Sequence, residues 1–337
     1  MKVRLKDIAQ EAGVSVATVD RVLNKRPGVH SRTASQVMRV MQRLGADGFD
    51  AAEPPLNRPL ALDFILPVGT NTFIDMLERC LVETARQWRD CIVAARVRRV
   101  PGFDPTRLAR ALVETGKDTD GIAFVAIDHP AVREAVNDLE RDGTPVVTLL
   151  SDLATTRRRA YVGIDNRAAG RTAGYLLGRF MGRPAGKVAM LCGNLSYRGH
   201  EEREMGFRHI LAEEFPGLEI VGLSEVQDDV EQSHSRARDL LAAHPDLVGI
   251  YNIGGGNRGV AQALSEAARS RDIVFIGHEL TEHTRRFLID GTMDAAINQD
   301  PVAEAGQAIR LLCAAAHDRE ESAPPVRIEV FLRENLP

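Results

Sequence analysis

Polar side chains recur where the apolar runs of this 337-residue sequence end, and such groups can hold a small polar molecule. Arg203 lies early in the helical stretch that follows the run Lys187–Cys192, and Glu279 and Gln299 end two later runs. Each hydroxyl of a sugar or polyol needs both a hydrogen-bond donor and an acceptor, which charged and amide side chains supply together. We therefore expect a ligand cleft formed by Asn71, Phe73, Asp128, Ser151, Arg203, Asn252, Glu279 and Gln299.

A glycine-rich run, Gly254–Gly259, leaves a second function open. It satisfies the pattern G-x-G-x-x-G after a predicted strand and before a predicted helix, and Glu279 lies near the distance at which an acidic residue holds a ribose. An NAD(P)-dependent oxidoreductase that uses this loop is therefore the alternative function. The run comes late in the chain, however, where the dinucleotide fingerprint usually opens its domain. We favour a tight turn beside the ligand cleft.

Two other motifs predict neither a metal site nor a catalytic centre. His278 and His283 are five positions apart, so they do not share a helix face and do not form the H-E-x-x-H pattern of zinc enzymes. Ser196, His200 and Glu201 are close in sequence but resemble no nucleophile elbow. We expect a protein that is not an enzyme and that uses no cofactor.

The elements that carry the polar residues alternate between short apolar runs and helical patterns such as Phe73–Arg89 and Pro130–Asp142. This alternation is typical of parallel sheets with helices on both faces. About nine strands exceed one sheet, so we expect two lobes with a cleft beyond the carboxyl ends of the strands. The predicted strands are Leu60–Leu66, Cys91–Val97, Gly121–Ile127, Val146–Leu150, Lys187–Cys192, Leu218–Leu223, Leu247–Ile253, Ile273–Ile276 and Asp294–Ile297.

The first 46 residues follow a different pattern, that of three short helices. The first is Lys6–Ala12, and Ser15 is a suitable N-cap for a second helix at about Val16–Asn24. In the second helix the apolar residues face a core, which leaves Ala17, Thr18 and Arg21 pointing outward. The apolar residues assigned to the core are Ile8, Ala9, Ala12, Val19, Val22, Leu23, Val37, Met41 and Leu44.

Charge separates this N-terminal part from the rest of the chain. Residues 1–46 carry nine Lys and Arg against three Asp and Glu, whereas the other 291 residues carry 34 against 44. A basic module on an acidic body predicts that the N-terminal part alone contacts a polyanion. Between the two parts, the stretch 46–59 contains three prolines and little periodicity, as linkers do.

The segment Leu5–Asn24 closely resembles, without a gap, the helix-turn-helix headpiece of the LacI/GalR (lactose-repressor) family. The resemblance implies an all-α headpiece over residues 1–46, a Pro-rich hinge over 47–59, and a two-lobed α/β effector domain over 60–337. That last domain is expected to be periplasmic-binding-protein-like (type I) and to form the dimer. The pieces of the body that carry the resemblance are Val162–Asn166, Ala169–Arg171, Arg203–Phe207, Ile276–Glu279 and Ile297–Asp300.

By this resemblance the second helix enters the major groove of double-stranded operator DNA. Val16, Ala17 and Arg21 match base-reading positions, and Arg pairs bidentately with guanine while small apolar groups meet thymine methyls. The positions matched to phosphate contacts are Ser15, Thr18, Asn24, His30 and Thr33. In the body, Arg203, Glu279 and Gln299 match positions that bind the effector. The expected protein is a transcriptional repressor, homodimeric or tetrameric, controlled by a sugar, a polyol or a derivative.

Two residues depart from the family pattern. Asp20 replaces the usual serine, and its carboxylate repels phosphates unless it accepts from a cytosine amino group or holds Arg21 in place. The family often has a hinge helix with a leucine that wedges into the minor groove. Leu56 is the candidate for that leucine, but Pro55 and Pro59 oppose a regular helix.

Composition is consistent with a cytoplasmic protein that has no membrane segment. No apolar run approaches the roughly 18 residues that span a bilayer, and the first residues are charged. The cysteines have neither disulfide-framework nor metal-ligand spacing, so we expect buried free thiols at Cys80, Cys91, Cys192 and Cys313.

Overall fold

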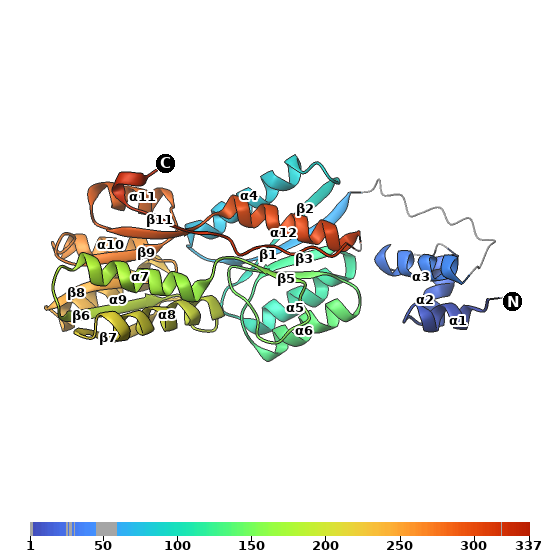
Figure 1. The fold of residues 1–337 in the computed structure, drawn as a ribbon, viewed down its shortest axis with the longest axis horizontal. Helices are drawn as coiled ribbons and strands as arrows, with labels where there is room; N and C mark the ends of the chain where they lie inside the picture. The colour runs from blue at the N-terminus through green and yellow to red at the C-terminus, as the bar shows by residue number, and fades with distance from the viewer. Residues whose placement is uncertain (1–2, 25, 27–28, 30, 45–58, 318) are drawn as a thin grey trace.

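A computed structural model describes residues 3–24, 26, 29, 31–44, 59–317 and 319–337 of the chain. The headpiece contains α1 (Leu5–Glu11), α2 (Val16–Leu23) and α3 (Ser31–Arg43) (Figure 1). Ser15 caps α2, because its side chain accepts from the Thr18 backbone N–H at 3.1 Å. The predicted core faces are confirmed: the buried headpiece residues are Ile8, Ala9, Ala12, Val19, Val37, Val40 and Met41, with Val22, Leu23 and Leu44 partly buried against them. His30 and Leu56 lie outside the described residues.

The first lobe is a five-stranded parallel sheet in the order β2-β1-β3-β4-β5. Figure 1 shows α4 and α12 on one side of this sheet and α5 and α6 on the other. The helix α12 comes from late in the chain and packs against α4, β1, β3, β4 and β5. The elements are β1 (Leu60–Val68), α4 (Thr72–Gln87), β2 (Val93–Pro101), α5 (Pro105–Thr115), the 3₁₀ turn Gly116–Asp118, β3 (Gly121–Val125), α6 (Pro130–Arg141), β4 (Val146–Leu149), β5 (Ala160–Val162) and α12 (Pro301–Ala316).

The second lobe is a six-stranded sheet in the order β11-β10-β9-β8-β6-β7, parallel except for β11. Alternate residues of a strand serve opposite faces, so Val188 and Met190 pack in the cluster that includes α7, whereas Ala189 and Leu191 pack in the one that includes α9 and α10. The elements are α7 (Asn166–Phe180), β6 (Gly186–Cys192), α8 (Arg198–Glu214), β7 (Leu218–Glu225), α9 (Val230–Ala243), β8 (Leu247–Asn252), α10 (Asn257–Glu266), β9 (Val274–His278), α11 (Glu282–Asp290), β10 (Ala295–Gln299), β11 (Ile328–Phe331) and the 3₁₀ turn Arg333–Asn335.

Three connections join the lobes: β5 to α7, β10 to α12, and α12 to β11. Two of them are tied together, since the Val326 N–H donates to the Gly163 carbonyl at 3.1 Å. Neighbouring crossings of this kind form a hinge about which two lobes can change their relative orientation. Within the described residues, no helix combines the length and the apolar character needed to cross a membrane.

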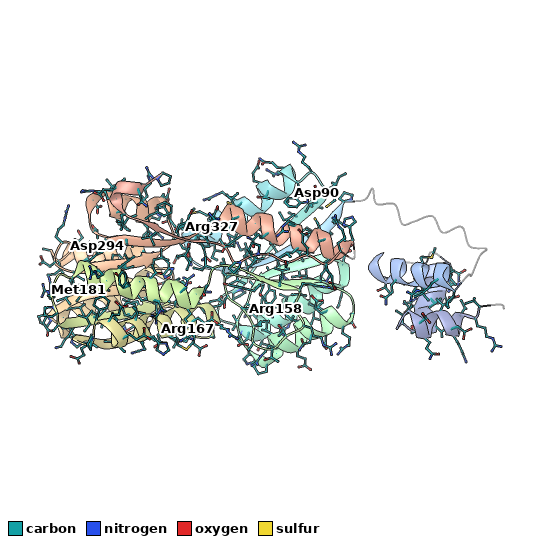
Figure 2. The ribbon with its side chains drawn as sticks, in the orientation of Figure 1. Asp90, Arg158, Arg167, Met181, Asp294 and Arg327 are labelled. Atoms are coloured by element: carbon teal, nitrogen blue, oxygen red, sulfur yellow. The ribbon has the colours of Figure 1, made fainter. Side chains whose placement is uncertain are left out.

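Two glycines set the close packing of α7 on α8. A Cβ at Gly170 would lie 1.9 Å from the Arg203 carbonyl oxygen, and a Cβ at Gly206 would lie 2.1 Å from the Arg167 carbonyl oxygen (Arg167 is labelled in Figure 2). Only glycine lets the two backbones approach this closely. The contact fixes Arg203 of α8 beside the first turn of α7, which is where the candidate site begins.

Candidate effector site and DNA-binding surface

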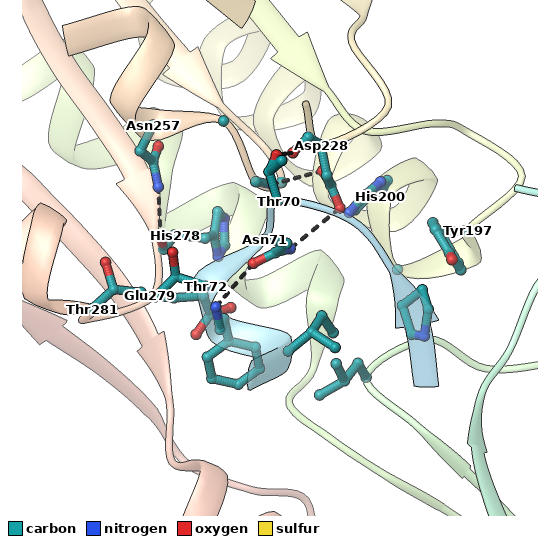
Figure 3. Close-up of a pocket in the computed structure, with 18 of the residues that line it drawn as sticks. Thr70, Asn71, Thr72, Tyr197, His200, Asp228, Asn257, His278, Glu279 and Thr281 are labelled. Carbon is teal, nitrogen blue, oxygen red and sulfur yellow. Dashed lines mark hydrogen bonds between the residues drawn. The ribbon is translucent and has the colours of Figure 1, made fainter. Parts of the chain in front are cut away.

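A cavity of about 90 Å³ lies between the lobes, at the carboxyl ends of strands from both sheets (Figure 3). The first lobe lines it with the β1–α4 turn and the residues after β4. The second lobe contributes the start of α8, the loops after β7 and β8, the end of β9 with the residues that follow it, and the last residue of β10. Six of the eight predicted ligand residues line this cavity: Asn71, Phe73, Ser151, Arg203, Glu279 and Gln299.

Arg203 is the buried cation of the site, with 5% of its surface exposed. Its Nε donates to Asn166 Oδ1 at 2.7 Å, and its Nη1 donates to the Ile253 carbonyl at 2.9 Å. Its Nη2 lies 3.9 Å from Glu279 Oε1. The guanidinium is therefore held by α7 and by the end of β8, and its remaining edge faces the carboxylate.

Glu279 lies directly after β9 in a backbone conformation, φ 71°, that non-glycine residues rarely adopt. The Thr284 hydroxyl holds this conformation by donating to the Glu279 carbonyl at 2.6 Å. The side chain of Glu279 accepts from Gln299 Nε2 at 2.7 Å. Burial raises the pKa of the Glu279 carboxyl to about 7, against the opposing effect of Arg203. Strained backbone and a shifted pKa at a cavity wall are both typical of functional sites.

A second buried carboxyl, Glu304, lies in the first turn of α12 and is fully enclosed. Within the described part of the chain, neither of its oxygens has a hydrogen-bond partner. Burial, and then the neighbouring Glu279, raise the pKa of Glu304 well above its usual value, whereas Arg203 lowers it. Arg203 is therefore the cation that offsets two buried carboxyls.

His278 adds a neutral polar group to the cavity wall. Its Nε2 lies 2.8 Å from the Tyr251 hydroxyl, and burial holds its pKa well below the usual value. Among the described residues, nothing pairs with His278 Nδ1 or with Gln299 Oε1. A buried polar atom without a partner is costly, and both of these atoms belong to residues that line the cavity.

Direct hydrogen bonds cross the cleft and join the two lobes. Asn71 Nδ2, from the first lobe, donates to Asp228 Oδ2 at 3.3 Å, and the Thr70 hydroxyl donates to the Asp228 carbonyl at 3.2 Å (Figure 3). The Gly199 N–H of the second lobe also donates to the Ser151 hydroxyl of the first lobe at 3.2 Å. Any ligand that replaces these contacts alters the preferred orientation of one lobe on the other.

Two predicted ligand residues, Asp128 and Asn252, are not among those that line the cavity. Asp128 is paired instead with Arg133, with Oδ1 and Nε 3.2 Å apart. Asn252 is completely buried behind the glycine loop, where its Nδ2 donates to Asn257 Oδ1 and to the carbonyls of the loop. Asn252 ends β8 and Asp128 follows β3, as expected, but their side chains fix local structure. Asp152, which follows β4, is paired in the same way with Arg158 (labelled in Figure 2).

Several residues that line the cavity are not among the predicted ligand residues, because they do not lie at the end of a predicted strand. Tyr197 and His200 flank the start of α8, and Asp228 follows β7 in a left-handed conformation. Burial lowers the pKa of His200, and Asp228 opposes that shift. The ring of Tyr197 lies between Phe103 and His200 in edge-on contacts, with centroids 5.2 and 5.5 Å away. Its side chain gives the cavity an aromatic wall.

The glycine loop does not present a free phosphate cradle. The Gly255 N–H donates to Asp228 Oδ1 at 2.7 Å, so a carboxylate of the chain already occupies the amide that a pyrophosphate would use. Gly256 takes a left-handed conformation, φ 87°, and starts α10. The loop is a tight turn at the cavity wall, and nothing in the site supports the oxidoreductase alternative. Within the described residues there is also no group of three metal-ligating side chains that could hold an ion.

The predicted base-reading face of α2 is open to solvent. Val16, Ala17 and Arg21 are all exposed. The Ser15 and Thr18 hydroxyls lie 2.8 Å apart at the start of the helix, and Thr33 is half-buried on α3. Ser15, Val16, Ala17 and Thr18 thus lie at the N-terminal end of α2, and Arg21 is exposed in its last turn.

Asp20 is engaged within the headpiece, and among the described residues its carboxylate forms no hydrogen bond or ion pair with Arg21. Its Oδ2 lies 3.3 Å from Arg26 Nη1, and its Oδ1 accepts from Asn24 Nδ2 at 2.8 Å. The same Asn24 amide donates to the Asp20 carbonyl at 2.9 Å. Of the two roles predicted for Asp20, holding Arg21 is therefore wrong. Asn24, predicted to contact a phosphate, is exposed at the C-terminal end of α2, where its amide nitrogen donates to the Asp20 carbonyl and carboxylate.

Two family models match this chain, one over the headpiece and one over the body. Residues 4–45 match the model described as bacterial regulatory proteins, lacI family. Residues 62–320 match the model of the periplasmic binding protein domain. The two matches correspond to the headpiece and to the two-lobed body.

Similar proteins of known role include two bacterial regulators. The catabolite control protein A of Priestia megaterium is 29% identical over 170 residues, which cover 50% of this chain and 49% of that protein. The HTH-type transcriptional regulator DegA of Bacillus subtilis is 24% identical over 321 residues, which cover 94% of this chain and 90% of that protein.

Solved structures share the fold of the body. The glucose-galactose binding protein GanP of Geobacillus stearothermophilus has a TM-score of 0.74 and 24% identity, covering 82% of this chain and 99% of that one. A carbohydrate transporter solute binding protein of Agrobacterium radiobacter, in complex with D-arabinose, has a TM-score of 0.76 and 19% identity, covering 82% and 95%. Together with the headpiece geometry, the two family matches assign the chain: it belongs to the LacI family of bacterial regulatory proteins.

Proposed function

We propose that this protein is a transcriptional repressor that binds operator DNA through its headpiece and is controlled by a monosaccharide or related polyol bound between its lobes. It acts without a catalytic step, in the cytoplasm, where its operator lies. The observation that carries the proposal is a cavity lined by buried polar side chains of both lobes, in a chain whose first residues form a lacI-type headpiece.

The chemistry of the cavity favours a neutral polyhydroxy ligand over an anion. Arg203 already has Asn166, the Ile253 carbonyl and Glu279 around it, so its charge is offset within the protein. Asp228 adds negative charge to the wall, while His278 is neutral. Tyr197 and Phe73 supply apolar surface for the faces of a sugar ring. Several solved structures with a similar fold are those of sugar-binding proteins, which supports the same ligand class.

The protein is proposed to act as a homodimer, or as a tetramer built from dimers. One headpiece offers a single recognition helix, which is too few contacts for tight specific binding. Two headpieces related by a two-fold axis match the two half-sites of a pseudo-palindromic operator.

A ligand screen tests the proposed effector class. We expect one or more pentoses, hexoses or polyols to raise the melting temperature of the full-length protein, because a ligand at 100 times its Kd stabilises by about 2.7 kcal/mol. Gln299→Ala should lose most of this shift, since Gln299 lines the cavity with an unpaired oxygen. Gln262→Ala, an exposed glutamine on α10, should keep it. Stabilisation by NADH with no response to any sugar or polyol would instead support the oxidoreductase.

A further inference from the structure

Two cysteines far apart in the sequence are in contact in the first lobe. Cys91 Sγ and Cys313 Sγ lie 3.1 Å apart, although the residues are separated by 222 positions. Cys91 occupies the bend between α4 and β2 and is half-buried, whereas Cys313 lies in the last turns of α12 and is buried. Both are free thiols in this structure. A disulfide bond of about 2.05 Å needs the two sulfur atoms to approach by only about 1 Å more.

We propose that Cys91 and Cys313 form a redox-sensitive pair, which a peroxide converts into a disulfide within one chain. The effector and the operator play no part in this reaction, so the proposal stands independently of the function proposed above. Disulfides that form transiently in otherwise reduced proteins usually have a sensing role.

The unequal exposure of the two thiols gives the order of the steps. Burial, and contact with Cys91, raise the pKa of the Cys313 thiol, so Cys313 stays protonated while the more accessible Cys91 meets the oxidant. The Cys91 thiolate attacks one oxygen of hydrogen peroxide, the O–O bond breaks, and the hydroxide released takes up a proton to become water. Cys313 then attacks the Cys91 sulfenic acid, which loses its hydroxyl as a second water together with the Cys313 proton. The two thiols supply both electrons that reduce the peroxide.

The pair lies close to the start of β1 at one end of α12, and the other end of α12 lies at the effector site. Next to Cys91, the Ile92 carbonyl accepts from the Leu60 N–H at 2.8 Å, so the bend anchors the first residue of β1, where the chain arrives from the headpiece. At the other end of α12, the capping residue Asp300 follows Gln299 of the cavity wall. A disulfide would therefore bind the headpiece end of the first lobe to a helix that begins at the effector site.

Thiol counting on the full-length protein tests the pair. After treatment with hydrogen peroxide and denaturation, maleimide labelling should find two thiols instead of the four cysteines of the sequence. Peptide mapping without reductant should then find Cys91 linked to Cys313. Cys91→Ser should prevent the loss at equal peroxide, whereas Cys80→Ser should still form the link. Four free thiols after treatment, or a disulfide between two chains, would overturn the proposal.

Thermal unfolding supplies a second readout. Because the loop closed by the disulfide is long, oxidation should raise the melting temperature by about 5–10 °C, and dithiothreitol should reverse the increase. Cys91→Ser, at a half-exposed bend, should fold normally and show neither effect. A linked protein that melts at a lower temperature would contradict a disulfide compatible with the native geometry.

Discussion

Arg203→Ala is expected to lower the free energy of unfolding by about 3–5 kcal/mol, the usual cost of removing one partner from a buried ion pair. The variant leaves Asn166 Oδ1 and the Ile253 carbonyl without their donor, and it leaves Glu279 and Glu304 without the cation that offsets them. Denaturant unfolding measures the loss. The matched control is Arg198→Ala on the same helix, because Arg198 forms a partly exposed pair with Glu202 and should cost about 1 kcal/mol or less.

The loss should be larger at pH 8 than at pH 5. Glu279 has a pKa of about 7 in the folded protein, above the value of about 4.3 expected when unfolded. A carboxyl with a raised folded pKa contributes stability below its unfolded pKa, and that contribution disappears as the pH rises through the folded pKa. Removing Arg203 raises the pKa of Glu279 and Glu304 further. Ionising these carboxyls at high pH therefore costs the folded variant more free energy than it costs the folded wild type. Equal losses at both pH values would contradict this electrostatic role.

Because Arg203 has these structural contacts, Arg203→Ala is a poor test of its role in binding the effector. From the sequence alone, this variant is expected to lose the effector response and to keep normal DNA binding. A destabilisation of several kcal/mol removes that separation, because a partly unfolded protein binds neither ligand. Glu279→Gln keeps the side-chain volume and an acceptor for one of the two hydrogen bonds that Gln299 donates, so it is the better variant for studying the effector.

Arg21→Ala is expected to weaken binding to the selected operator by about 1–3 kcal/mol, roughly 5- to 150-fold, and to relax the choice at one base pair. Arg21 is exposed on α2 and lies outside the headpiece core, so the variant should unfold like the wild type. Operator sequences are first selected with the wild type from random duplexes, and binding is then measured for every single-base variant.

Two further variants separate base reading from general binding. Thr18→Ala should weaken all sequences by a similar factor, as loss of a phosphate contact does. Arg43→Ala, on α3 and paired with Glu11, should leave the sequence choice unchanged. If Arg21→Ala discriminates between bases as well as the wild type, α2 is not the reading helix.

The sequence predicts the fold well because its main signals are local. Each of the nine predicted strands is present with shifted ends, since the apolar runs are long and turn residues separate them. Two strands are not predicted. β5 has three residues and follows the run Arg157–Arg159, and β11 is an antiparallel edge strand that is only partly buried. Short and edge strands depend on pairing with neighbours, and a single stretch of sequence does not contain that information.

The candidate site is predictable only where backbone position decides the outcome. Parallel strands end at a common edge, so residues such as Glu279 and Gln299 follow from the pattern. Whether a side chain at that edge faces the cavity depends on its tertiary partners, as the pairing of Asp128 with Arg133 demonstrates. Asp228 enters the site through a loop conformation, φ 54°, that the sequence pattern does not specify.

The central claim is that a ligand between the lobes controls DNA binding, and reciprocal coupling tests it most directly. With the sugar or polyol from the ligand screen and the selected operator, the Kd for DNA is measured with and without sugar. The Kd for sugar is then measured with and without DNA. We predict that the two factors are equal and lie between about 5 and 150, because coupling between sites is reciprocal. Glu279→Gln should weaken sugar binding while keeping DNA affinity without sugar. An operator Kd that a cleft-bound sugar leaves unchanged would contradict the claim.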